Sequence, residues 1–123
     1  MIRGGTSKET VIAKTVTPYR ALALQARCKA VNELTVDEAR ASMAAALEHT
    51  AYLIDGAMRF IGPDTRLIVL PEYSLTGFPF GESIAEWREK AALAPDGPEY
   101  DRLSEIAAER RIFLAGNAYE TDA

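Results

Sequence analysis

Three short apolar runs, separated by longer segments with helical spacing, dominate the sequence. The runs occupy residues 20–26, 66–71 and 111–116, and polar or turn residues bound each of them. Runs of this length are typical of buried β-strands. The second run is aliphatic from Leu67 to Leu70 with little alternation, which predicts a central parallel strand covered on both faces.

A long segment with helical spacing joins the first two runs. Thr35 and Glu38 have the spacing of a capping box, and Gly62-Pro63 ends the pattern. One face of the predicted helix is apolar and is formed by Val36, Met43, Leu47, Thr50, Ile54, Met58 and Ile61. The opposite face carries Glu48, Tyr52, Asp55 and Arg59.

Two shorter helices are predicted between the second and third runs. Ser83 and Glu86 form a second capping box, which opens a helix that extends to about Leu93. Pro98 suits a first helical position, and the apolar stripe that follows it consists of Tyr100, Leu103 and Ala107. The order strand, helix, strand, helix, helix, strand indicates an α/β fold with mostly parallel strands and right-handed crossover helices.

The predicted helices cover one face of the predicted sheet, and the sequence offers nothing for the other face. We therefore expect the chain to be a fragment, or to pair with a second copy or a second polypeptide. Residues 1–18 are expected to form a polar, flexible lead-in, and residues 19–123 an incomplete domain.

The composition is that of a soluble globular protein, with 123 residues, 48% hydrophobic and 26% charged. A formal net charge of −4 argues against a nucleic-acid surface. No apolar run is long enough for a transmembrane helix or a signal peptide, so we expect a cytoplasmic protein without membrane contact. One cysteine and one histidine can build neither an internal disulfide nor a zinc site.

Glu72 is the residue that the sequence marks for chemistry. It follows the second apolar run and Pro71 directly, and ligands of parallel α/β sheets bind beyond the carboxyl ends of the strands. A carboxylate that is partly desolvated at such a place is suited to act as a general base. Gly77 permits a sharp turn after it, and residues 78–80 (Phe-Pro-Phe) can form the wall of a pocket.

The segment Leu70-Pro71-Glu72, followed by residues 76–79 (Thr-Gly-Phe-Pro), resembles the glutamate segment of the nitrilase superfamily of carbon–nitrogen hydrolases. The order of the surrounding features agrees, from the first strand ending at Gln25 to Asp96-Gly97-Pro98 and the third apolar run. The resemblance covers residues 19–120 and is carried mainly by the glutamate segment.

The resemblance implies a four-layer α-β-β-α sandwich, of which this chain forms the front part. It also implies hydrolysis of non-peptide carbon–nitrogen bonds in a small-molecule amide or nitrile by a glutamate, a lysine and a cysteine, without metal or organic cofactor. Family members are usually homo-oligomers. Only Glu72 can be carried over, because the lysine and the cysteine lie on later strands, beyond position 123. The chain as it stands is expected to be inactive.

Five further residues carry side chains suited to a site or lie near Glu72 in the predicted fold. Tyr73, Phe78 and Asn117 are candidates for the substrate pocket. Cys28 precedes the glutamate, whereas the family nucleophile follows it, so an incidental role is expected for this thiol. Lys90 is explained by an ion pair with Glu86 at i,i+4.

Two alternative hypotheses account for the same predicted strands and helices. It could be a non-catalytic α/β interaction module that pairs with a partner through its open sheet face, which predicts a stable soluble oligomer. A flavodoxin-like ligand-binding domain shares the topology, but no glycine-rich phosphate loop follows the first strand.

Overall fold

A parallel sheet with helices on one face forms the framework of the protein. The computed structural model describes residues 14–122. Its elements are β1 (Arg20–Ala23), α1 (Val36–Ile61), β2 (Thr65–Val69), α2 (Ile84–Ala91), α3 (Pro98–Arg110) and β3 (Phe113–Ala115). The strand order is β1-β2-β3 and both pairings are parallel, as the sequence predicts. Most of the predicted lead-in, residues 1–13, lies outside the described residues.

Each strand is shorter than the apolar run that predicted it. Pairing ends where the strands diverge into loops, although Leu24 N–H still donates to Val69 O at 2.9 Å. Leu70 N–H likewise donates to Ala115 O at 2.8 Å. The three strand ends therefore stay in contact as they enter the loops that carry the candidate site.

The helix boundaries follow from local chemistry. Thr35 and Ser83 cap α1 and α2 through complete capping boxes, which confirms both predictions. Gly62 ends α1 with φ 123°, a conformation that favours glycine. Pro98 begins α3, and Arg111 closes it in the left-handed conformation with φ 52°.

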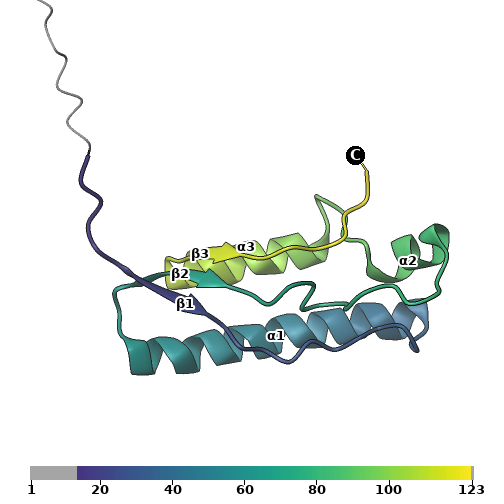
Figure 1. The fold of residues 1–123 in the computed structure, drawn as a ribbon, viewed down its shortest axis with the longest axis horizontal. Helices are drawn as coiled ribbons and strands as arrows, with labels where there is room; N and C mark the ends of the chain where they lie inside the picture. The colour runs from purple at the N-terminus through teal and green to yellow at the C-terminus, as the bar shows by residue number, and fades with distance from the viewer. Residues whose placement is uncertain (1–13, 123) are drawn as a thin grey trace, which may run out of the picture.

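One face of the sheet, the covered face, packs against α1 and α3. Its centre is Ile68 of β2, which is 0% exposed. Around it lie Leu24, Ile54 of α1, and Ile106 of α3. Figure 1 shows α1 running along the strands, α3 beside β3, and α2 beyond the carboxyl ends of the strands.

The opposite face, the open face, has no helix over it in residues 14–122. The strand register aligns two rows across it, Ala21–Leu67–Phe113 and Ala23–Val69–Ala115. Val69 is 40% exposed and Phe113 is 77% exposed. The expectation that the middle strand is covered on both faces is therefore wrong for the described residues, because both helices that reach the sheet pack on the same side.

Most of the apolar face predicted for α1 is confirmed. Met43, Leu47, Thr50 and Ile54 are buried, whereas Val36 is exposed. Val36 is the first residue of the helix, and its side chain does not pack in the core that the other residues of this face form. In α3 the deepest residue is Ile106, which the predicted stripe omitted.

A polar link joins the two helices of the covered face on their outer side. Arg110 of α3 donates two hydrogen bonds to the Asp55 carboxylate of α1, at 2.7 and 2.8 Å. This guanidinium lowers the pKa of Asp55 below its ordinary value, against a smaller opposing effect of burial. Within residues 14–122, none of the helices combines the length and the apolar character that crossing a membrane needs.

Candidate active site

The loops that follow the three strands meet at Tyr73. This residue lies in the turn after β2. Its backbone N–H donates to Oδ1 of Asn117, which follows β3, at 2.7 Å. Its backbone carbonyl accepts from the thiol of Cys28, which follows β1, at 3.2 Å. Residues after β1 and β3 thus hold both backbone polar groups of Tyr73, directly beside Glu72.

The backbone of Tyr73 is in the left-handed region, with φ 44°. Such a conformation costs a residue other than glycine about 1–2 kcal/mol. Hydrogen bonds from the backbone N–H groups of Thr76 and Gly77 to the Tyr73 carbonyl, at 3.2 and 2.9 Å, help to offset this cost. No local sequence pattern predicts the left-handed backbone of Tyr73.

Gly77 ends the turn, as the sequence predicts. Its φ is 72°, and a Cβ atom there would lie 3.3 Å from both Cα and Cβ of Ala30. A side chain at this position would therefore be strained and would press on the loop after β1. The close approach keeps the turn against the rest of the site.

Glu72 stands between β2 and this turn, at the carboxyl end of the middle strand. Its placement at the strand end confirms the local geometry expected from the sequence. The partial burial expected for it is wrong for residues 14–122, where Glu72 is exposed. The reason is that no other described segment covers this edge of the open sheet.

A row of aromatic rings extends from the turn and includes Tyr119, which sequence reasoning missed. The Tyr119 ring stacks on Tyr73 with centroids 4.4 Å apart, and Phe78 meets Tyr73 edge-on at 5.0 Å. Trp87 meets Tyr119 at right angles at 5.6 Å. Burial raises the pKa of Tyr119, and neighbouring Tyr73 and the charge of Glu72 add to the increase. Only its position two residues after Asn117 could have suggested a role.

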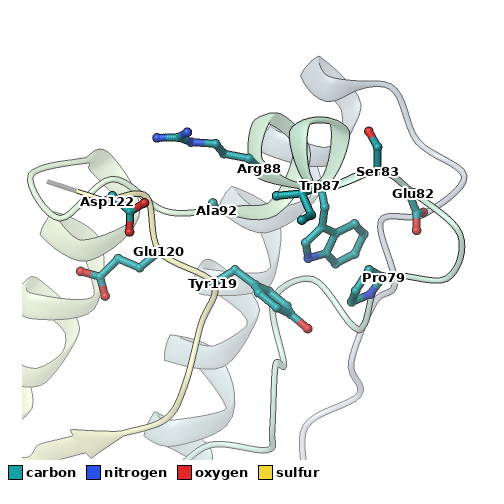
Figure 2. Close-up of a pocket in the computed structure, with 10 residues that line it drawn as sticks. Pro79, Glu82, Ser83, Trp87, Arg88, Ala92, Tyr119, Glu120 and Asp122 are labelled. Carbon is teal, nitrogen blue, oxygen red and sulfur yellow. The ribbon is translucent and has the colours of Figure 1, made fainter.

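A cavity of about 380 Å³ lies at the far end of this aromatic row. Its lining residues are Pro79, Glu82, Ser83, Ile84, Trp87, Arg88, Ala92, Tyr119, Glu120 and Asp122. Figure 2 shows the rings of Tyr119 and Trp87 side by side, with Pro79 below Trp87. Trp87 is 6% exposed, and its Nε1–H has no hydrogen-bond partner in residues 14–122. Trp87 also belongs to a small core cluster with Val31, Ala39 and Ala91.

The predicted pocket residues divide between different surroundings. Tyr73 is partly buried at the centre of the cluster, and Phe78 is exposed against its ring. Asn117 lines a second cavity, of about 460 Å³, together with Leu70, Ser74 and Glu120. The structure brings Tyr73, Phe78 and Asn117 together, but it does so around the turn rather than around a single cavity.

Cys28 and Lys90 both have hydrogen-bond partners in the structure. Cys28 is exposed and donates to the Tyr73 carbonyl. Lys90 donates from Nζ to the carbonyl of Asn32 at 2.9 Å. The expected ion pair with Glu86 is wrong, because the Glu86 carboxylate accepts from Ser83 N–H in the cap of α2.

Histidine, cysteine, aspartate and glutamate side chains do not gather in residues 14–122 into a group that could hold a metal ion.

The chain is a parallel α/β protein with an accessible carboxylate after its middle strand, at the edge where ligands of such folds generally bind. The sequence pattern of the family described as carbon–nitrogen hydrolase matches residues 30–122, more than half of the chain. The chain therefore belongs to the carbon–nitrogen hydrolase family, which confirms the resemblance to the nitrilase superfamily. No curated protein and no solved structure is similar enough to this chain to count as a match.

Proposed function

We propose that this chain supplies Glu72 as the general base of a hydrolase that acts on amide or nitrile carbon–nitrogen bonds. The lysine and the cysteine of that site come from polypeptide outside the 123 residues. The single observation that carries the proposal is the position of Glu72 beyond β2, beside a turn held by the segments after β1 and β3, in a chain of the carbon–nitrogen hydrolase family.

In the proposed reaction with an amide, the glutamate takes the thiol proton while the sulfur attacks the amide carbon. The lysine stabilises the negative charge that develops on the attacked group. The glutamic acid then gives its proton to the leaving nitrogen, and the carbon–nitrogen bond breaks to leave a thioester. Water attacks the thioester with the carboxylate as base, which releases the carboxylic acid and restores the thiol.

We also propose that a second sheet covers the open face, in an α-β-β-α sandwich. The two rows of the open face consist entirely of apolar residues, which are Ala21, Leu67, Phe113, Ala23, Val69 and Ala115. Contiguous apolar surface of this kind is unfavourable in water unless another element packs on it. Such a second layer would also enclose the exposed Glu72 and limit the access of bulk water to the site.

The test uses the polypeptide encoded by the complete reading frame, including any codons after Ala123. Ammonia release is measured with a panel of amides and nitriles. Glu72→Gln keeps the size of the side chain but cannot take up a proton, so we expect kcat to fall about 10³-fold. Glu33→Gln is the matched control, because Glu33 is exposed and accepts no hydrogen bond within residues 14–122. Equal activity of both variants would contradict the proposed role of Glu72.

The open face also favours a second candidate, a non-catalytic module that binds a partner through the sheet. It predicts that the complete polypeptide hydrolyses none of the substrates and that the 123-residue chain forms a discrete soluble oligomer. Size-exclusion chromatography with light scattering distinguishes such an oligomer from aggregate. Hydrolysis that depends on Glu72 would exclude this candidate.

A further inference from the structure

The two polar groups of the Tyr73 backbone are satisfied very differently. Its carbonyl accepts from Cys28, Thr76 and Gly77. Its N–H donates to Asn117 Oδ1 at 2.7 Å, and no other acceptor takes it among residues 14–122. The carbonyl can lose one partner and keep two, whereas the N–H depends on a single side chain.

Asn117 has the chemistry that this contact requires. An N–H group needs an acceptor, so the carboxamide oxygen faces Tyr73 and the amide nitrogen points elsewhere. The residue lies after β3, whereas Tyr73 lies after β2, so the bond joins two neighbouring strand ends. Two residues further on, Tyr119 stacks on the Tyr73 ring at 4.4 Å. The segment after β3 thus contacts both the backbone and the ring of Tyr73.

Glu72 is joined to Tyr73 through one peptide bond, so the orientation of its carboxylate depends on the conformation of the turn. Without the bond to Asn117, the strained φ of 44° loses one of the interactions that offset its cost. The turn would then relax toward ordinary backbone conformations. A displacement of about 1 Å in a reacting group lowers a rate by about 10²-fold.

We propose that Asn117 is a positioning residue, whose carboxamide holds the Tyr73 turn and thereby aims the Glu72 carboxylate. This inference rests on the proposed function of Glu72. Asn117 touches no reacting atom in this scheme, and its effect passes through the backbone of Tyr73.

The test compares variants in the complete polypeptide. Asn117→Leu removes the acceptor at similar volume, and we expect kcat to fall about 30-fold with KM changed less than about threefold. Asn117→Asp keeps an oxygen at the same place, and we expect it to restore most of kcat. Cys28→Ala should cost less than about threefold, because the Tyr73 carbonyl keeps two donors. Asn32→Leu is the matched control, since Asn32 donates to Phe78 O and Glu82 rather than to Tyr73.

A second measurement does not need activity. Hydrogen exchange of the Tyr73 amide, followed by NMR in the 123-residue chain, should be slow in the natural sequence and in Asn117→Asp, and fast in Asn117→Leu. Wild-type kcat in Asn117→Leu, or Asn117→Asp as slow as Asn117→Leu, would overturn the inference. If Glu72→Gln has no effect on hydrolysis, the proposed function fails instead, and the exchange rates still decide whether Asn117 holds the turn.

Discussion

Both faces of the sheet carry apolar side chains, but one face is buried under helices and the other is exposed to water. On the covered face, Ile68 is 0% exposed between α1 and α3. On the open face, its neighbour Val69 is 40% exposed and Phe113 is 77% exposed. Neighbouring residues of one strand point to opposite faces. The same five-residue strand therefore contributes one face to a buried core and the other to an exposed apolar surface.

This difference shows that residues 14–122 bury one face of the sheet and leave the other face accessible to water. A strand that normally has water on one face alternates apolar and polar side chains, whereas a strand buried on both faces does not. The lack of alternation in β2 is what the proposed second layer would explain, and residues 14–122 contain no such layer. The site shares this property, because Glu72 is placed by the described chain but is left exposed at the same edge.

The largest effect that separates the two faces is expected from truncating neighbouring residues of β2. Ile68→Ala should lower the free energy of unfolding of the 123-residue chain by about 3 kcal/mol, because it opens a cavity in the closed core. Val69→Ala, the matched control, should cost less than about 1 kcal/mol, because its side chain is already in contact with water. Urea unfolding followed by circular dichroism measures both values. Similar losses for the two variants would mean that the open face is covered in solution.

A charge placed on the open face should reduce self-association of the 123-residue chain, whereas it should reduce the stability of the complete polypeptide. In the 123-residue chain, Phe113→Lys should weaken self-association about tenfold, or about 1.4 kcal/mol, because the exposed ring no longer contributes to contacts between copies. In the complete polypeptide, the same substitution should lower the midpoint of urea unfolding, because it buries a charge under the proposed second sheet. Sedimentation velocity and urea unfolding are the respective measurements.

Phe60→Lys is the control for this pair of experiments. Phe60 is 95% exposed and lies on α1 rather than on the sheet. It should change neither self-association nor unfolding by a comparable amount. If Phe60→Lys disperses the short chain as well as Phe113→Lys does, the open face is not the surface through which copies associate.

The fold was largely predictable because its signals are local. Capping boxes at Thr35 and Ser83 and the stop at Gly62 depend on a few adjacent residues, and the structure contains all three. The exposure of one face of the middle strand was not predictable, because an apolar pattern indicates that a strand is buried but not which polypeptide buries it. Homo-oligomer formation and a cytoplasmic location stay predictions.

The candidate site was predictable only in part. Glu72 and Gly77 could be recognised because a strand end and a turn leave marks in the sequence itself. The contacts of Asn117 and Tyr119 with Tyr73 join residues 44 and 46 positions apart, and no local pattern records them. The left-handed backbone of Tyr73 was also hidden, because tyrosine carries no preference for that conformation.

The smallest effect concerns the ion pair that joins the two helices of the covered face. The pKa of Asp55 is lowered in the folded chain by the hydrogen bonds from Arg110. A carboxylate with a lowered pKa contributes stability above its unfolded pKa of about 3.9, and this contribution is lost as the pH falls through the folded pKa. The Asp55 side chain is 46% exposed, so the contribution should stay below about 1 kcal/mol.

Asp55→Asn should therefore destabilise the chain slightly at about pH 7, and its difference from the natural sequence should shrink toward about pH 2, as the Asp55 carboxylate takes up a proton. Urea midpoints at the two pH values measure the difference. Asp96→Asn, in an exposed loop, is the control that corrects for the loss of one charge. A gap between Asp55→Asn and the natural sequence that is equally large at both pH values would show that packing around Asp55, rather than its charge, holds α1 against α3. The covered face would then be closed by apolar contacts alone, and the two faces would differ only in what packs on them.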